Sequence, residues 1–150
     1  MNESAEVEIL LVEDNPHDLQ LTLRALRRAN LANAIHVARD GEEALEFLFP
    51  PGSTAADAPD PTLRVILLDL KLPKVDGLEV LARIKGDART RRIPVVMLTS
   101  SKEQNDVLES YDLGVNSYIV KPVNFERFAE AIQQLGLYWL LTNHLPNTER

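Results

Sequence analysis

Polar residues that could take part in binding or catalysis stand at the ends of four hydrophobic runs in this chain. They are Glu13 and Asp14 after Ile9–Val12, Asp69 after Val65–Leu68, Thr99 after Val95–Leu98, and Lys121 after Tyr118–Val120. Unbroken apolar runs are typical of strands that are buried on both faces of a parallel sheet. Ligands of such sheets bind outside the carboxyl ends of the strands. The order of acids, hydroxyl and ammonium therefore predicts a phosphate-handling site at one sheet edge.

The acidic residues of this set favour a bound divalent cation. Carboxylates at adjacent strand ends repel one another unless a cation lies among them. Mg²⁺ prefers oxygen ligands and is usually held by one or two carboxylates together with phosphate oxygens, which suits Asp14 and Asp69. Thr99 can donate a hydrogen bond to a phosphoryl oxygen, and Lys121 can bring a positive charge to the same group.

Each of these residues also has a purely structural interpretation. Asp69, or the pair Glu13 and Asp14, could be turn formers or helix caps after a strand. Thr99 could be an ordinary strand residue, and Lys121 a solvated loop lysine. Their coincidence after the first, third, fourth and fifth predicted strands, with none after the second, favours the functional interpretation.

The segments between the apolar runs have helical periodicity, so strands and helices alternate along the chain. The predicted strands are Ile9–Val12, Asn33–Ala38, Arg64–Asp69, Ile93–Thr99 and Ser117–Val120, and the predicted helices are Pro16–Ala29, Asp40 to about Leu48, Gly77–Lys85, Ser101 to near Gly114, and an extended last helix capped by Asn124. Five strand-helix repeats with short connections predict a flavodoxin-like, doubly wound α/β fold. Its five-stranded parallel sheet would have the order 2-1-3-4-5, with five helices.

Length and composition indicate one domain that is not built to bind nucleic acid. The 150 residues include 23 acidic and 16 scattered basic residues, for a formal charge of -7, and no cysteine. The start of the chain is neither basic nor a long apolar stretch, so we expect a cytoplasmic protein without a membrane segment. Phe49–Leu63 is rich in proline and is predicted as a surface loop. We therefore predict a single domain, with its core over about 7–134 and a helical extension over about 135–145.

Over residues 7–134 the chain resembles the receiver domain of two-component response regulators. The motifs that carry the resemblance are Val12–Asn15, similar to the family's acidic pair, Leu67–Pro73 followed by Asp76 and Gly77, similar to its phosphoacceptor loop, and Leu98–Ser100 and Tyr118–Pro122, similar to its switch strands. The proline-rich insertion and the tail through Trp139 most resemble the small stand-alone regulators that pair with bacterial phytochrome histidine kinases.

The resemblance implies a role for each residue of the site. Asp69 would accept a phosphoryl group from a sensor histidine kinase, a bacteriophytochrome in the narrower resemblance. Mg²⁺ would be held by Asp14, Asp69 and the main-chain carbonyl of Lys71. Glu13 would act on the ion through a water molecule or through contact with its ligands. Thr99 and Lys121 would contact the phosphoryl oxygens, and Lys121-Pro122 would be a cis peptide. The chain would thus be a signalling protein that assists its own phosphorylation and dephosphorylation, rather than an enzyme.

An output surface is also implied by the resemblance. Movement of Thr99 toward the phosphoryl group would let Tyr118 turn inward, which would change the face formed by the helix after Ser101, the strand Ser117–Val120 and the final helix. The alternative for Tyr118 is a simple surface aromatic.

The C-terminal segment suggests self-association. Phe125, Phe128, Ile132, Leu135 and Trp139 recur at helical spacing, and residues 137–141 are apolar on nearly all sides. An exposed apolar patch usually marks a partner surface. We therefore predict a homodimer, with contacts from Phe128, Ile132, Leu135, Tyr138 and Trp139. The alternative is that this segment folds back on its own domain.

Two rival functions can be compared with the sequence. A phosphatase of the haloacid-dehalogenase type also combines an Asp nucleophile with Mg²⁺, a hydroxyl and a lysine. It needs a second Asp two residues after the nucleophile, where this chain has Lys71, and a cap domain. A nucleotide-binding module would show a glycine-rich phosphate loop, and neither common form occurs among the six glycines. Turnover of free phosphoesters would distinguish the phosphatase from a receiver.

Overall fold

The structure is a computed structural model that describes residues 7–31, 34–53, 62–100 and 111–142. Its elements are β1 (Ile9–Val12), α1 (Pro16–Arg28), β2 (Ile35–Ala38), α2 (Gly41–Leu48), β3 (Val65–Asp69), α3 (Gly77–Gly86), β4 (Val95–Thr99), β5 (Ser117–Val120), α5 (Phe125–Gln134) and α6 (Tyr138–Thr142). The helix predicted from Ser101 to near Gly114 lies mostly outside the described residues. Within the described ranges, no helix is both long and apolar enough to cross a membrane.

The strands form one parallel sheet in the order β2-β1-β3-β4-β5, as predicted. Val12 pairs with Ala38 on one side and Leu68 on the other, and Asp69 pairs with Leu98. Every residue of β1, β3 and β4 is buried, as expected for strands covered on both faces. The register aligns the carboxyl ends of β1, β3, β4 and β5 at one edge.

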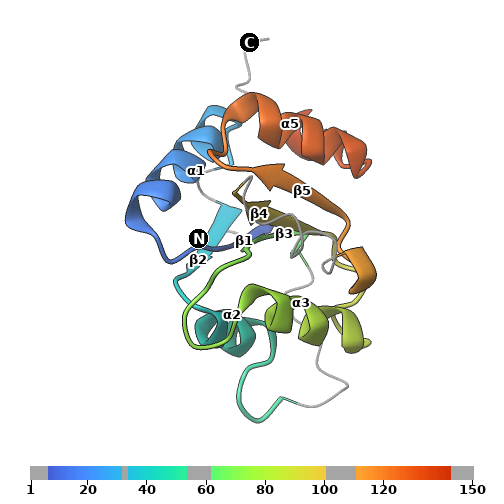
Figure 1. Ribbon diagram of the computed structural model, residues 1–150. Helices are drawn as coiled ribbons and strands as arrows, with labels where there is room; N and C mark the ends of the chain where they lie inside the picture. Colours follow the sequence, from blue (N-terminus) through green and yellow to red (C-terminus); the bar gives the residue numbers. More distant parts are fainter. Residues whose placement is uncertain (1–6, 32–33, 54–61, 101–110, 143–150) are drawn as a thin grey trace, which may run out of the picture.

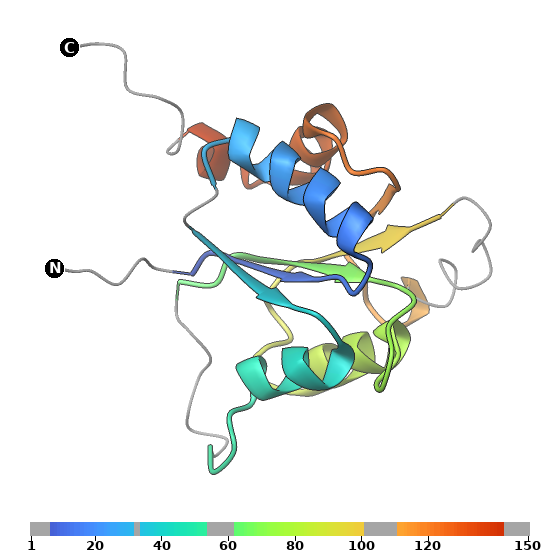
Figure 2. The same cartoon turned by 90° about the vertical axis from the view of Figure 1, so that its left-hand side faces the viewer.

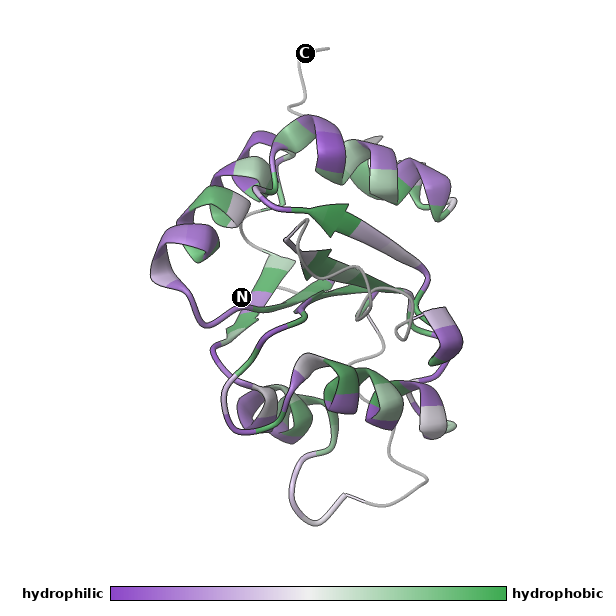
Figure 3. Ribbon diagram, viewed as in Figure 1, coloured by the Kyte–Doolittle hydropathy of each residue, from purple (hydrophilic) through white to green (hydrophobic). Residues whose placement is uncertain are grey.

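Helices cover both faces of the sheet (Figures 1 and 2). α1 and α5 lie on one face, and α2 and α3 lie on the other. Leu26, Phe128 and Ile132 belong to the core on the first face, whereas Leu81 and Ile84 belong to the core on the second. The central strands are hydrophobic along their length in Figure 3. Burial of these apolar surfaces is the main force that holds the three layers together.

Polar side chains cap the first turns of three helices, among them the predicted cap Asn124. The side chains of Asn15, Asp40 and Asn124 each accept a hydrogen bond from the backbone N–H three residues later, at 2.9, 2.7 and 2.8 Å. Each bond satisfies an N–H that the first turn of a helix otherwise leaves unpaired. α1, α2 and α5 therefore begin at defined points beyond the preceding strands.

The prediction of one extended last helix is wrong. α5 ends at Gln134, and Gly136 adopts a φ of 76° while Leu137 N–H donates to the Ile132 carbonyl at 3.0 Å. A left-handed glycine with this backward bond closes a helix, because a residue with a Cβ avoids that conformation. The chain then forms the separate short helix α6.

α6 folds back on its own domain, which is the alternative considered for the C-terminal segment. Leu140 is fully buried and Leu141 nearly so, both in the core on the sheet face that α1 and α5 cover. Phe128 and Ile132 are also fully buried there, so their prediction as dimer contacts is wrong. The other three predicted contacts keep some exposure: Leu135 is half-buried, and Tyr138 and Trp139 are 59% and 41% exposed.

Candidate functional site

The parallel register brings the predicted polar residues to one edge of the sheet. β3 and β4 end on Asp69 and Thr99, while Glu13 and Lys121 directly follow β1 and β5. Backbone hydrogen bonds continue the pairing past the strands: Glu13 N–H donates to the Ala38 carbonyl at 3.0 Å, and Lys121 N–H donates to the Thr99 carbonyl at 2.7 Å. These bonds fix the backbone that carries the two side chains.

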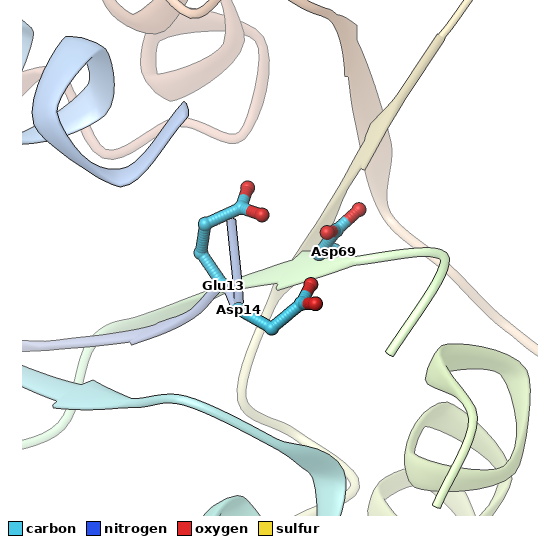
Figure 4. Close-up of side chains that lie close together, drawn as sticks. All are labelled: Glu13, Asp14 and Asp69. Carbon is cyan, nitrogen blue, oxygen red and sulfur yellow. The ribbon is translucent and has the colours of Figure 1, made fainter. Parts of the chain in front are cut away.

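Three carboxyl groups converge from the ends of β1 and β3 (Figure 4). Glu13, Asp14 and Asp69 each offer an oxygen within 4.8 Å of the others. Glu13 is fully buried and Asp69 is 4% exposed, whereas Asp14 is open to solvent. The cluster therefore has a desolvated interior and an accessible side.

Burial raises the pKa values of two acids of this cluster, Glu13 and Asp69. Burial, aided by the neighbouring Asp69, raises the pKa of Glu13 from 4.5 to about 8, against the opposing effect of Lys121. Burial also raises the pKa of Asp69 above its usual value, although Glu13 and Lys121 oppose the shift. Without a cation, Glu13 therefore holds a proton at neutral pH. One of its oxygens, Oε1, lacks a hydrogen-bond partner among the described residues although it is buried.

The ammonium of Lys121 is the positive charge of the site. Its Nζ lies 3.1 Å from Glu13 Oε1, without hydrogen-bonding geometry, and 3.1 Å from Asp69 Oδ1. Although burial acts to lower the pKa of Lys121, Asp69 and Glu13 raise it, and the net shift is upward. The lysine is therefore firmly protonated beside the Asp69 carboxylate.

Asp18 is a member of the site that sequence reasoning missed. Its Oδ2 accepts a hydrogen bond from Lys121 Nζ at 3.1 Å. Asp18 stands on the first turn of α1, three residues after the cap Asn15. The position of Asp18 on the first turn of a helix that follows the acidic pair was the available signal, but its contact with Lys121 depends on how α1 packs in the folded domain.

The donor set fits a hard divalent cation. The cluster offers only oxygen atoms, it contains buried acids with raised pKa values, and Glu13 Oε1 accepts no hydrogen bond from the described residues, although the Lys121 ammonium is 3.1 Å away. A bound cation would relieve the repulsion that these features express. Lys71, whose carbonyl was predicted as a further ligand, follows Asp69 closely and donates its N–H to Asp69 Oδ1 at 3.4 Å.

Close backbone packing holds the loop after Asp69. A Cβ on Gly77 would overlap the carbonyl oxygens of Asp69 and Leu70, so no larger residue fits without a shift. On the far side of the loop, Lys74 Nζ lies 3.5 Å from Asp40 Oδ2 at the start of α2. The loop that carries Lys71 is thus fixed between α3 and α2.

The two predicted switch residues lie on the neighbouring strands β4 and β5. Thr99 is buried, and its hydroxyl donates to the Ser100 carbonyl at 3.0 Å. Tyr118 is 42% exposed and meets Tyr111 edge to face, with ring centroids 6.0 Å apart. Tyr118 also lines an open groove of about 500 Å³ between β5 and α5. Lys121-Pro122 is a cis peptide, as the resemblance implied.

Comparison with known proteins gives a consistent assignment. The sequence profile of the response regulator receiver domain matches residues 9–133. Response regulator Rcp1 of Synechocystis sp. is 43% identical over 138 residues, which cover 92% of this chain and 92% of Rcp1.

Solved structures are similar over nearly the full chain. The bacteriophytochrome response regulator AtBRR is 53% identical, with a TM-score of 0.73 over 95% of this chain and 99% of its own. The phosphorylated cyanobacterial phytochrome response regulator RcpA is 41% identical, with a TM-score of 0.70 over 95% and 100% of the two chains. The Mn²⁺-bound form of Rcp1 is 40% identical, with a TM-score of 0.69 over 94% and 99%.

Proposed function

The chain belongs to the response regulator receiver family, and from this premise we propose that it accepts a phosphoryl group on Asp69 from a sensor histidine kinase. One observation carries the proposal. Asp69 is a nearly buried carboxylate at a strand end, with the Lys121 ammonium 3.1 Å away and two further acids beside it. This arrangement provides a nucleophile together with the charges that a phosphoryl group requires.

The transfer proceeds by attack of an Asp69 oxygen on the phosphorus of a phosphohistidine. The new O–P bond forms as the P–N bond breaks, and its electron pair leaves with the imidazole nitrogen. Lys121 neutralises charge on the phosphoryl oxygens, which is the main contribution that a protein can make to a loose transition state.

A divalent cation completes the site in this proposal, and Mg²⁺ is the ion that we assign. Asp14, Asp69 and the main-chain carbonyl of Lys71 would hold it, with Glu13 acting through water or from behind. The ion would neutralise charge on the transferred group when bound. The support is the oxygen-only cluster of carboxylates and the Mn²⁺-bound form of a related regulator.

The proposed output passes through Thr99 and Tyr118. A phosphoryl group adds charge and acceptor oxygens, so the Thr99 hydroxyl can exchange its bond to the Ser100 carbonyl for one to the new group. Tyr118 then turns from its partly exposed position, which changes the groove between β5 and α5. The helix after Ser101, a further part of this proposed face, lies outside the described residues.

Partner contacts form the last part of the proposal. The likeness to AtBRR and to a phytochrome regulator supports a kinase of the bacteriophytochrome class. A homodimer remains our proposal, with Leu135, Tyr138 and Trp139 as its contacts. Tyr138 and Trp139 supply exposed aromatic surface next to the half-buried Leu135, and aromatic residues are common anchors at interfaces.

Intact-mass spectrometry tests the central proposal. The chain is incubated with Mg²⁺ and a small acyl phosphate, and compared with Asp69→Asn and with a sample that contains chelator. We expect one added phosphoryl group in the wild type and none in either control. An adduct of equal yield on Asp69→Asn would assign the modification elsewhere and refute the role of Asp69.

A further inference from the structure

We propose that Asp18 is a positioning residue for phosphoryl transfer, because its carboxylate holds the Lys121 ammonium beside Asp69. The inference rests on the function proposed above and adds a residue to its machinery. Asp18 touches neither the Asp69 carboxylate nor the carboxylate cluster in any described contact, so it acts through the lysine.

Three elements hold the lysine by its ammonium group. Nζ lies 3.1 Å from Glu13 Oε1 after β1, 3.1 Å from Asp69 Oδ1 on β3, and 3.1 Å from Asp18 Oδ2 on α1. A lysine side chain has a flexible four-carbon stem, so one or two contacts leave it several rotamers. The third contact, from a separate element, restrains Nζ beside Asp69.

Asp18 holds the outer position of this arrangement. Its side chain is 29% exposed, against 6% for Asp69 and 0% for Glu13. The ammonium is therefore held by the two buried acids, Glu13 and Asp69, and by the more exposed Asp18.

The backbone of Asp18 is itself firmly placed. Its N–H donates to the Asn15 side chain at 2.9 Å, and the next residue, Leu19, is buried in the core. A carboxylate on the first helical turn is also stabilised by the helix dipole. Asp18 can therefore restrain the lysine rather than follow it.

Asp18 also has an effect that would change the rate of phosphorylation in the opposite direction, so the measured change in rate tests the proposal. A lone negative charge at the mouth of the site would repel an anionic phosphodonor and slow the reaction. The ammonium 3.1 Å away cancels most of the Asp18 field at the donor. Loss of Asp18 therefore removes a restraint on Lys121 more than it removes repulsion, and the reaction should become slower.

The experiment measures the rate constant of phosphorylation of the full chain by a small acyl phosphate with Mg²⁺, followed by intact mass. Asp18→Ala removes the contact, and Asp18→Glu retains a charge that can reach Lys121. Glu79→Ala is the matched control, because Glu79 is an exposed acid on the first turn of α3 that is not part of the carboxylate cluster. We expect about a five-fold slower reaction for Asp18→Ala, and a change of less than about two-fold for the other two variants.

A double variant separates positioning from general damage. In a Lys121→Met background, Asp18→Ala should have no further effect on the rate constant, because the group that it positions is gone. A rate constant for Asp18→Ala that equals or exceeds that of the wild type overturns the proposal. So does an equal slowing by Asp18→Ala with Lys121 present and absent.

A second readout does not depend on phosphorylation. In isotope-labelled, metal-free protein, the two Hε protons of Lys121 should have distinct NMR shifts in the wild type and in Glu79→Ala, and a single averaged shift in Asp18→Ala. Unchanged, distinct shifts in Asp18→Ala would overturn the restraint. If the wild type takes up no phosphoryl group, the proposed function fails, while these spectra still decide whether Asp18 holds Lys121.

Discussion

Replacement of Glu13 by glutamine should stabilise the metal-free protein in alkaline solution. It should also make the free energy of unfolding less dependent on pH. Glu13 is fully buried, and burial with the nearby Asp69 raises its pKa to about 8. Its carboxyl group is neutral in the folded chain at pH values where it is ionised in the unfolded chain. Glutamine has nearly the same shape, carries no charge at any pH, and can accept the hydrogen bonds that Asn15 N–H and Lys121 now donate to Glu13 Oε2.

The magnitude follows from the two pKa values. Between 4.5 in the unfolded chain and about 8 in the folded chain, the folded state binds more protons, so stability falls as the pH rises. The contribution is fully present below 4.5 and lost above about 8, a total of roughly 5 kcal/mol at about 1.4 kcal/mol per pKa unit. Between about pH 5.5 and about pH 8.5 the wild type should lose about 3 kcal/mol from this group.

Urea denaturation in the presence of EDTA measures this difference. Wild type and Glu13→Gln should agree within about 1 kcal/mol at about pH 5.5, and Glu13→Gln should be more stable by about 3 kcal/mol at about pH 8.5. Glu79→Gln, at an exposed position on the first turn of α3, is the control and should follow the wild type. If the wild type and Glu13→Gln keep a constant difference across this range, the burial of Glu13 does not perturb its ionisation and the reasoning is refuted.

Two further predictions concern the cation and the C-terminal helix. Mg²⁺ at about ten times its dissociation constant should stabilise the wild type by about 1.4 kcal/mol and raise its melting temperature in calorimetry, because it binds only the folded state; an equal rise in Asp14→Asn would exclude Asp14 as a ligand. Leu140→Ala should destabilise the chain by about 2 to 4 kcal/mol in urea, because Leu140 is fully buried, whereas exposed Tyr138→Ala should cost less than about 1 kcal/mol. Equal losses for the two variants would contradict the packing of α6 on the core.

The sequence predicted most element positions, and the misses have physical causes. The strand predicted from Ile93 begins instead at Val95, because Ile93 N–H is already used in a turn to the Thr90 carbonyl and Pro94 has no N–H to give. The helical spacing of apolar residues ran on past Leu135, but the left-handed Gly136 ends α5 there. The spacing of apolar residues indicates which side chains share a helix face, but it does not indicate where the backbone changes direction.

The site residues were also predicted in part from the sequence and in part found only in the structure. Hydrophobic runs that end in Asp69 and Lys121 were enough to predict which side chains meet, because parallel strands share one carboxyl edge and their pairing is set by main-chain hydrogen bonds. The sequence by itself therefore determined the sheet order, the helix caps and the acid, hydroxyl and lysine set of this protein. Only the tertiary structure decided that Asp18 reaches Lys121, that Phe128 and Ile132 face the core, and that α6 folds back onto the core that α1 and α5 cover. These contacts depend on the angle and depth at which one layer packs on another, which side-chain shapes from distant parts of the chain settle together.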